Sequence, residues 1–191
     1  MPGKVRRIVT AINDAGRSYI FSDTELPTAD VALGEPIRTG LWLTGAAPAS
    51  NLGNNDPVPD GVLFRTPPPD RGGTVIRITD IAPQTVRAYD PADLARRGCL
   101  TTPDRSARHP GFHATDTVDY AICLEGEVWA MLDEDETLMR AGDVMIQRGT
   151  FHAWSNRSDA VCRMLFVLID AEPLERKKPA PVPTARPQPR T

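Results

Sequence analysis

The sequence predicts an all-β protein, either a sandwich or a barrel, and three observations lead to this. The second half of the 191-residue chain is a series of short strand patterns at close spacing, separated by turn residues. The strongest patterns are rich in valine and isoleucine, as is typical of strands that bury one face. Only one short stretch has the features of a helix.

Composition narrows the possible functions. Hydrophobic residues make up 40% of the chain, enough for a real core, and the formal net charge is −3. Without a basic stripe, nucleic acid is not an expected partner. No apolar run approaches the roughly 20 residues that span a membrane, and none of signal-peptide length follows the basic N-terminus. Cys99, Cys123 and Cys162 lack metal-type or redox-type spacing, so we expect reduced thiols in a cytoplasmic protein.

The first half of the chain contains three predicted strands. Residues 18–22 alternate between apolar and polar after a turn signal at 13–16, and residues 39–44 form a second candidate. Residues 74–81 are the cleanest strand of this half, because four β-branched residues fall within eight positions. We expect residues 1–90 to pack on the barrel as extra strands and loops of the same domain.

Loops and one helix complete the first half. Residues 45–72 are rich in proline, glycine and asparagine and are predicted to be a loop, either a lid over the barrel or a crossing on its outside. Residues 91–97 are predicted to form a short helix, with Asp90 as the N-cap and Pro91 at the first helical position.

The barrel core is expected at residues 91–170, where strands follow one another quickly. A tail at 171–191, rich in proline and charge, is predicted to be disordered. The predicted strands of this half are 118–124, 126–132, 137–140, 143–147 and 161–169.

Residues 113–156 hold the candidate chemistry. His113 and His152 each stand at the mouth of a strand pattern, and alternate residues of a strand face the same side. Asp119 therefore shares parity with His113, and His152 shares parity with Trp154. Two imidazoles and one carboxylate on converging strands form the arrangement that binds Fe(II), and also Zn, Mn or Ni. The predicted metal ligands are His113, Asp119 and His152.

Residues 110–170 also resemble the two sequence motifs of the cupin superfamily, and in particular single-domain conserved-barrel cupins of the cupin 2 type. Counting back from Gly126, His113 takes the place of the first motif histidine, Thr115 that of the second, and Asp119 that of the glutamate. In the second motif, Gln147 replaces a proline. The residues that match the second motif are Gly142, Gly149, His152 and Asn156.

The resemblance implies a jelly-roll barrel, also called a double-stranded β-helix, with extra N-terminal strands and one short helix. It also implies a homodimer that associates through the outer sheet or the N-terminal arm. A usual cupin site has three histidines and one glutamate. This chain offers two histidines, an aspartate and a hydroxyl.

The leading functional hypothesis is a divalent-metal enzyme acting on a small oxygenated acid or phenol-like compound. The metal would polarise a substrate carboxylate or carbonyl, and decarboxylation or a related lyase step is expected. Asp116 would move a proton, and Gln147 would orient the substrate. The candidate substrate contacts are Trp154, Trp129, Phe166 and Thr115, although such aromatic residues equally suit a core. Two alternatives stay open: an Fe(II)-dependent dioxygenase and a non-catalytic cupin that binds a small ligand.

Overall fold

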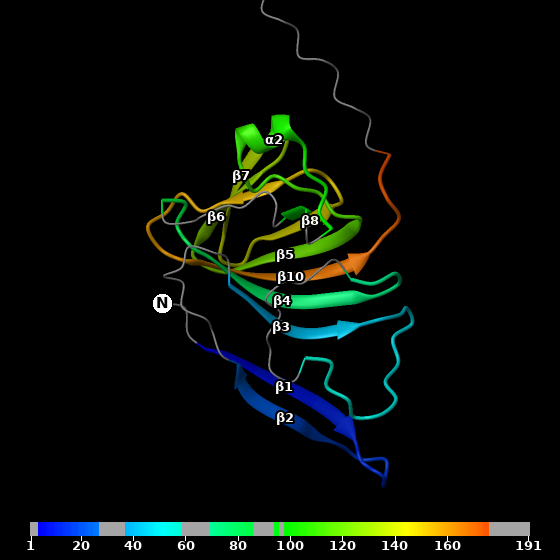
Figure 1. Cartoon of the computed structure of the whole chain (residues 1–191). Helices are drawn as coiled ribbons and strands as arrows, with labels where there is room; N and C mark the ends of the chain where they lie inside the picture. Colours follow the sequence, from blue (N-terminus) through cyan, green and yellow to red (C-terminus); the bar gives the residue numbers. More distant parts are fainter. Residues whose placement is uncertain (1–3, 27–36, 59–68, 86–93, 96–97, 176–191) are drawn as a thin grey trace, which may run out of the picture.

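The computed structural model describes residues 4–26, 37–58, 69–85, 94–95 and 98–175. Within these ranges the chain forms ten strands and one complete short helix, and two of its sheets face each other as a barrel (Figure 1). The predicted all-β class is therefore confirmed. The same ranges contain no helix long and apolar enough to cross a membrane.

Two antiparallel sheets form the barrel. Their inner faces enclose the core, and a separate hairpin lies beyond one end of the larger sheet (Figure 1). The larger sheet has the strand order β3 (Ile37–Thr44), β4 (Thr74–Ile81), β10 (Cys162–Asp170), β5 (Thr117–Glu125) and β8 (Val144–Arg148). The smaller sheet has the order β7 (Glu136–Arg140), β6 (Glu127–Met131) and β9 (Ala153–Ser155). The hairpin consists of β1 (Val5–Ile12) and β2 (Ser18–Leu26).

Every strand predicted from the sequence is present, with bounds that differ by a few residues at most. The largest difference is at the strand predicted for residues 18–22, because β2 continues to Leu26. Two strands were missed. β1 carries charge at Arg6 and Arg7, which masks its alternation, and β9 has only three residues.

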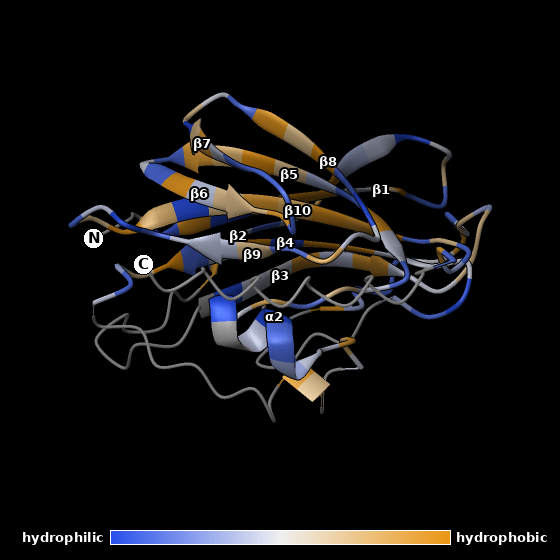
Figure 2. Ribbon diagram, turned by 90° about the horizontal axis from the view of Figure 1, so that it is seen from above, coloured by the Kyte–Doolittle hydropathy of each residue, from blue (hydrophilic) through white to orange (hydrophobic). Residues whose placement is uncertain are grey.

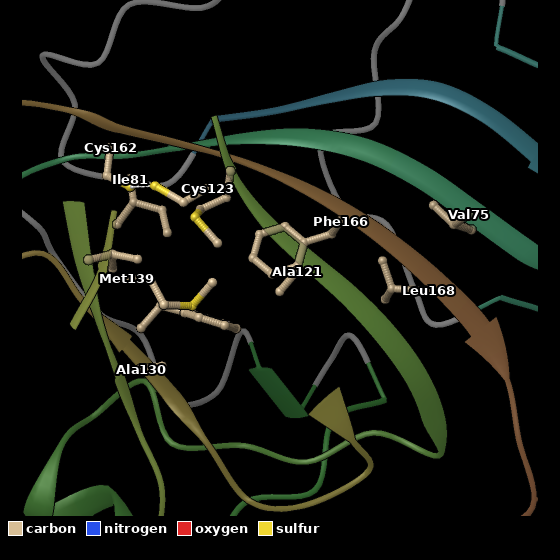
Figure 3. Packing of buried hydrophobic residues seen from close by; sticks show 12 residues of the cluster. Val75, Ile81, Ala121, Cys123, Ala130, Met139, Cys162, Phe166 and Leu168 are labelled. Carbon is tan, nitrogen blue, oxygen red and sulfur yellow. Dashed lines mark hydrogen bonds between the residues drawn. The ribbon is translucent and has the colours of Figure 1, made fainter. Parts of the chain in front are cut away.

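Alternating side chains of β5 and β10 fill the barrel interior. Ala121 and Cys123 on β5 pack with Phe166 and Leu168 on β10 (Figure 3). Met164 on β10 belongs to the same cluster, and all five residues are buried. Apolar colouring accordingly runs along both strands in Figure 2. Full burial of a large apolar side chain stabilises a fold by about 1.5–3 kcal/mol, so this register is strongly specified.

The turn between β5 and β6 requires Gly126. Its φ is +75°, and a Cβ added there would lie 2.9 Å from the carbonyl oxygen of Val161. Both the conformation and the close approach favour a residue without a side chain.

The hairpin is anchored to the barrel at its base. Val5 and Leu26 pack with Ile78, on the face of the larger sheet opposite to the core. Arg7 forms an ion pair with Asp56 and donates a hydrogen bond of 2.6 Å to the carbonyl of Val58.

Helix α2 (Pro103–Arg108) was not predicted from the sequence. It begins after Thr102 with a proline in its first turn, which suits a helix start. Arg105 fastens the helix by a 2.6 Å ion pair with Asp133 and lies 4.0 Å from the ring centre of Phe151. The helix predicted at 91–97 falls largely outside the described residues, as do residues 59–68 of the predicted loop and the tail from 176 onward.

Cys123 and Cys162 are buried thiols on neighbouring strands of the larger sheet. The Sγ atoms of Cys123 and Cys162 lie 3.8 Å apart inside the core. Burial raises the pKa of both thiols, most strongly for Cys162. Thiols of this kind behave as small apolar side chains rather than as nucleophiles.

Candidate functional site

His113 and His152 form a backbone bridge at the end of the barrel. Each peptide N–H donates to the carbonyl of the other residue at 2.9 Å, so the two residues stand directly opposite each other. Their imidazole rings consequently lie side by side, with centroids 4.5 Å apart. The sequence predicted these two histidines as site residues, and the structure brings them together.

Both imidazoles are held in the same tautomer. The Nδ1 of His113 lies 2.8 Å from the carbonyl oxygen of Gly111, and the Nδ1 of His152 lies 3.0 Å from that of Thr150. A carbonyl only accepts, so each Nδ1 must carry the proton. The Nε2 atom then bears the lone pair in the neutral ring, and neither Nε2 has a hydrogen-bond partner among the described residues.

The environment favours neutral rings. Burial lowers the pKa of His152 to about 4. Burial is also the main cause that lowers the pKa of His113 well below its usual value, followed by the adjacent His152 and then by the positive charges of Arg38 and Arg77. At neutral pH the site therefore presents two lone pairs, suited either to accept a proton or to bind a metal ion.

Asp119 lies on the inner face of β5, and only 6% of it is exposed. Burial raises its pKa, although a hydrogen bond from the Thr117 hydroxyl and the charge of Arg77 oppose the shift. Thr117 in turn is 2.8 Å from the hydroxyl of Thr115. The Oδ1 atom of Asp119 is buried without any hydrogen-bond partner in the described part of the chain. Such an atom suits a ligand or a retained proton.

The three predicted metal ligands do not gather into one group. Among the described residues, no three His, Cys, Asp or Glu side chains are arranged to hold a metal ion. The two imidazoles would suit a metal ion, but the Asp119 carboxylate accepts a hydrogen bond from the Thr117 hydroxyl. Where the cupin motif has its second histidine, this chain has the hydroxyl of Thr115. The triad of His113, Asp119 and His152 therefore stays a prediction.

An aromatic wall continues inward from the histidines. Trp154 meets His152 edge-on with ring centroids 5.7 Å apart, and Phe166 meets Trp154 at 5.4 Å. The guanidinium of Arg77 then lies 5.8 Å from the centre of the Phe166 ring. Two of the predicted substrate contacts, Trp154 and Phe166, therefore line the interior next to the histidines.

Sequence reasoning missed Arg77 and Arg38. Arg77 pairs in register with Phe166, so its side chain shares the inner face. Arg38 lies opposite Thr79 on that face and adds positive charge near His113. The sequence could have indicated the position of Arg77, because it has the same parity along β4 as Val75, which is buried.

Two further predicted residues, Gln147 and Trp129, have side-chain partners of their own. The Gln147 side chain donates to the carbonyl of Thr150 at 3.1 Å and to its hydroxyl, which ties it into the turn before His152. Trp129 lies on the side of β6 opposite to the buried Val128, under the guanidinium of Arg157 at 4.7 Å.

Asp116 and Asn156 sit in connecting segments. Asp116 precedes β5, and its carbonyl accepts from the N–H of Ala171. The Nδ2 of Asn156 donates to the carbonyls of Ile81 at 2.8 Å and Ala160 at 2.7 Å. Asn156 thus holds the connection between β9 and β10, and this structural role explains why an asparagine suits this position of the second motif.

Comparison with known proteins agrees with this architecture. A cupin domain profile matches residues 102–168. The chain belongs to the cupin superfamily. It is 31% identical over 170 residues to the phomopsin biosynthesis cluster protein C' of Diaporthe leptostromiformis, covering 85% of this chain and 77% of that protein.

Several fungal cupins named as oxidoreductases are also similar. The cupin-domain-containing oxidoreductase fogC of Aspergillus ruber is 29% identical over 177 residues, which cover 87% of this chain and 73% of that protein. Among solved structures, a Klebsiella pneumoniae protein with a double-stranded β-helix domain matches 76% of this chain and 84% of its own, with 14% identity and a TM-score of 0.43.

Proposed function

We propose that this cupin is an enzyme that transfers protons on a small oxygenated organic acid or phenol-like compound, with decarboxylation or a related lyase step as its reaction. The observation that carries the proposal is the juxtaposition of two imidazoles whose pKa values burial lowers, each with an Nε2 that has no hydrogen-bond partner within the described part of the chain. Asp119 on the inner face of the same barrel adds a carboxyl group that retains its proton to higher pH than usual. Paired groups whose pKa values are displaced by burial are typical of acid–base sites.

The substrate would lie against the aromatic wall. Trp154 and Phe166 offer ring faces and edges to a flat organic molecule. The positive charge of Arg77, which acts on both His113 and Asp119, favours an anionic group in the same space. A small carboxylic acid with an apolar or aromatic body meets both requirements.

The proposed chemical step is balanced without an oxidant. The bond between the carbon and its carboxylate breaks, carbon dioxide leaves, and the electron pair stays on the carbon. Asp119 would deliver its proton to that carbon and recover one from solvent. The Nε2 atoms of His113 and His152 would accept a hydrogen bond or a proton from a substrate hydroxyl.

An oxidoreductase is the second candidate. Its support is the naming of four similar fungal proteins as cupin-domain-containing oxidoreductases. The Fe(II)-dependent dioxygenase, one of the two alternatives from the sequence, would be an oxidoreductase of this kind. Any divalent ion would have His113 and His152 as its protein ligands among the described residues, and its chemistry would be Lewis-acid or dioxygen activation.

The test uses a panel of hydroxybenzoic acids and β-keto acids in deuterated water, with and without dioxygen and added metal ions. The proposal predicts release of carbon dioxide and one deuterium at the carbon that lost it. Asp119→Asn should slow this by 10²–10⁴-fold, the usual contribution of a general acid. Trp129→Phe, on the outer face of β6, is the control.

Two other outcomes would overturn the proposal. Consumption of dioxygen with an oxygenated product would establish the oxidoreductase. Binding of a panel compound without turnover under every condition would establish a ligand-binding cupin.

A further inference from the structure

The remaining histidine of the chain, His109, stands at the end of helix α2 and is only 3% exposed. Its peptide N–H donates to the carbonyl of Arg105 at 3.1 Å, so the backbone at this position is fixed by the helix. Its Nδ1 accepts a 3.1 Å hydrogen bond from the peptide N–H of Gly111. A nitrogen that accepts carries no proton, so the neutral ring of His109 has its proton on Nε2. This is the opposite tautomer to that of His113 and His152.

Gly111 connects His109 to His113. Its peptide N–H donates to the Nδ1 of His109, and its carbonyl oxygen accepts from the Nδ1–H of His113 at 2.8 Å. These two hydrogen bonds fix the peptide groups on both sides of the Gly111 Cα. The imidazole of His109 therefore helps to determine where the acceptor for the Nδ1 proton of His113 lies.

The turn around Gly111 is packed firmly, except at the glycine itself. The N–H of Phe112 donates to the carbonyl of His109 at 3.0 Å, and the Phe112 side chain is fully buried in a cluster with Ala153, which follows His152. Gly111 has no side chain that could pack, so the direction of its carbonyl depends on the hydrogen bonds that its peptide groups form.

Two simpler roles for the His109 side chain account less well for its position. The end of helix α2 uses the peptide N–H of this residue, which any amino acid except proline supplies. A place as a third metal ligand beside His113 and His152 does not fit, because no three His, Cys, Asp or Glu side chains gather within the ranges that the structure describes. The printed contact of the ring is with the Gly111 peptide.

Removal of the imidazole should be felt at His113. A buried N–H that loses its acceptor is costly, so the Gly111 peptide would reorient to pair it elsewhere. That movement would weaken the 2.8 Å hydrogen bond between the Gly111 carbonyl and His113. The tautomer of a neutral imidazole is set by the hydrogen bond that one of its nitrogens makes. Without that bond, the proton of His113 is free to occupy Nε2.

We propose that His109 is a positioning residue, which acts through Gly111 to hold the proton of His113 on Nδ1 and so keeps a lone pair on its Nε2 atom. Its effect on turnover rests on the proposed function, in which this lone pair accepts a hydrogen bond or a proton from the substrate. The tautomer of His113 does not rest on that function. His152 provides an internal reference, because its Nδ1 bonds to the carbonyl of Thr150 instead.

The test compares the ¹⁵N resonances of His113 and His152 in chelator-treated, substrate-free protein at pH 7. In asparagine, Oδ1 is the same number of bonds from Cα as Nδ1 in histidine, so His109→Asn keeps an acceptor for Gly111, whereas His109→Leu removes it. His109→Leu should move the Nε2 resonance of His113 toward that of a protonated nitrogen and leave His152 unchanged. His109→Asn should restore the wild-type resonance.

Activity and a control variant separate positioning from a loss of stability. On any substrate that the protein turns over, His109→Leu should lower kcat by about 100-fold, as a displaced reacting group does, and His109→Asn should recover most of it. Val5→Ala is the control, because Val5 packs on the outer face of the larger sheet and its loss should leave the His113 resonances unchanged.

A measurement on the wild type needs no substitution. An N–H···N hydrogen bond transmits a scalar coupling between its two nitrogens, so the amide nitrogen of Gly111 should couple to the Nδ1 of His109, whether or not His109→Leu folds. Absence of this coupling would overturn the inference. So would a folded His109→Leu protein with the wild-type His113 tautomer, or an equal change in Val5→Ala. Failure to turn over any substrate would count against the proposed function alone, since the tautomer is measured without substrate.

Discussion

Lowering the pH from 7 to 4 is expected to destabilise the folded protein through His152, and replacing His152 with glutamine should remove that effect. The folded site holds the pKa of His152 at about 4, whereas an unfolded histidine titrates near 6.5. Between these two values the unfolded chain binds more protons than the folded chain, so the free energy of unfolding falls as the pH falls. Above pH 6.5 both states are neutral at this residue and the full stability is present.

The size of the effect follows from the displacement of the pKa. Each unit corresponds to about 1.4 kcal/mol, so lowering the pKa from 6.5 to about 4 is worth roughly 3 kcal/mol. His113 should add to the loss in the same direction, because burial lowers its pKa as well. A domain is typically stable by only 5–15 kcal/mol, so a change of this size is readily measured.

Urea denaturation of wild type and His152→Gln at several pH values, in the presence of a chelator, provides the assay. Carboxylates that titrate elsewhere contribute equally to both proteins and cancel in the difference. The wild type should lose about 3 kcal/mol more than the variant between pH 7 and pH 4. Equal pH dependence in the two proteins would refute the buried, neutral state assigned to His152.

Three further predictions concern the scaffold and the site. Arg163→Met should lower the free energy of unfolding by about 3–5 kcal/mol. The substitution leaves the buried Asp80 carboxylate without the two 2.7 Å hydrogen bonds that Arg163 donates to it. An unchanged midpoint of urea denaturation would contradict this. Gly126→Ala should lower the melting temperature more than Gly142→Ala, because both glycines have positive φ but only the Cβ at 126 meets another atom, 2.9 Å away. Asp119→Asn should raise stability at pH 7, because burial disfavours the Asp119 carboxylate, and the gain should vanish on acidification below the usual aspartate pKa; a loss at pH 7 would be the contrary result.

The barrel strands were predictable because local pattern and tertiary role coincide there. β4 and β10 combine β-branched or apolar residues with lengths typical of strands, and both sit between two neighbours in the larger sheet. β1 was not predicted, because Arg6 belongs to an exposed ion pair and Arg7 to a buried one, and a sequence does not distinguish these. Helix α2 depends on Arg105 reaching Asp133, which is a tertiary contact.

The site was predictable in part for similar reasons. Strand parity correctly placed Asp119 on the same side as Ala121, and both are buried. The pairing of His113 with His152 is a cross-strand register between segments far apart in sequence, which parity within one strand does not determine. Whether Asp119 joins them as a ligand depends on its contact with Thr117, which also lies beyond the reach of a spacing rule.

The central claim is that His113 and His152 present unprotonated Nε2 atoms to the barrel interior, and ¹⁵N nuclear magnetic resonance of the chelator-treated protein tests it directly. The structure predicts that both rings at pH 7 are neutral with the proton on Nδ1, bonded to the carbonyls of Gly111 and Thr150. Each Nε2 should show the chemical shift of an unprotonated nitrogen and should respond when a substrate or metal ion is added. A proton on Nε2, or a charged imidazolium at pH 7, would contradict the account.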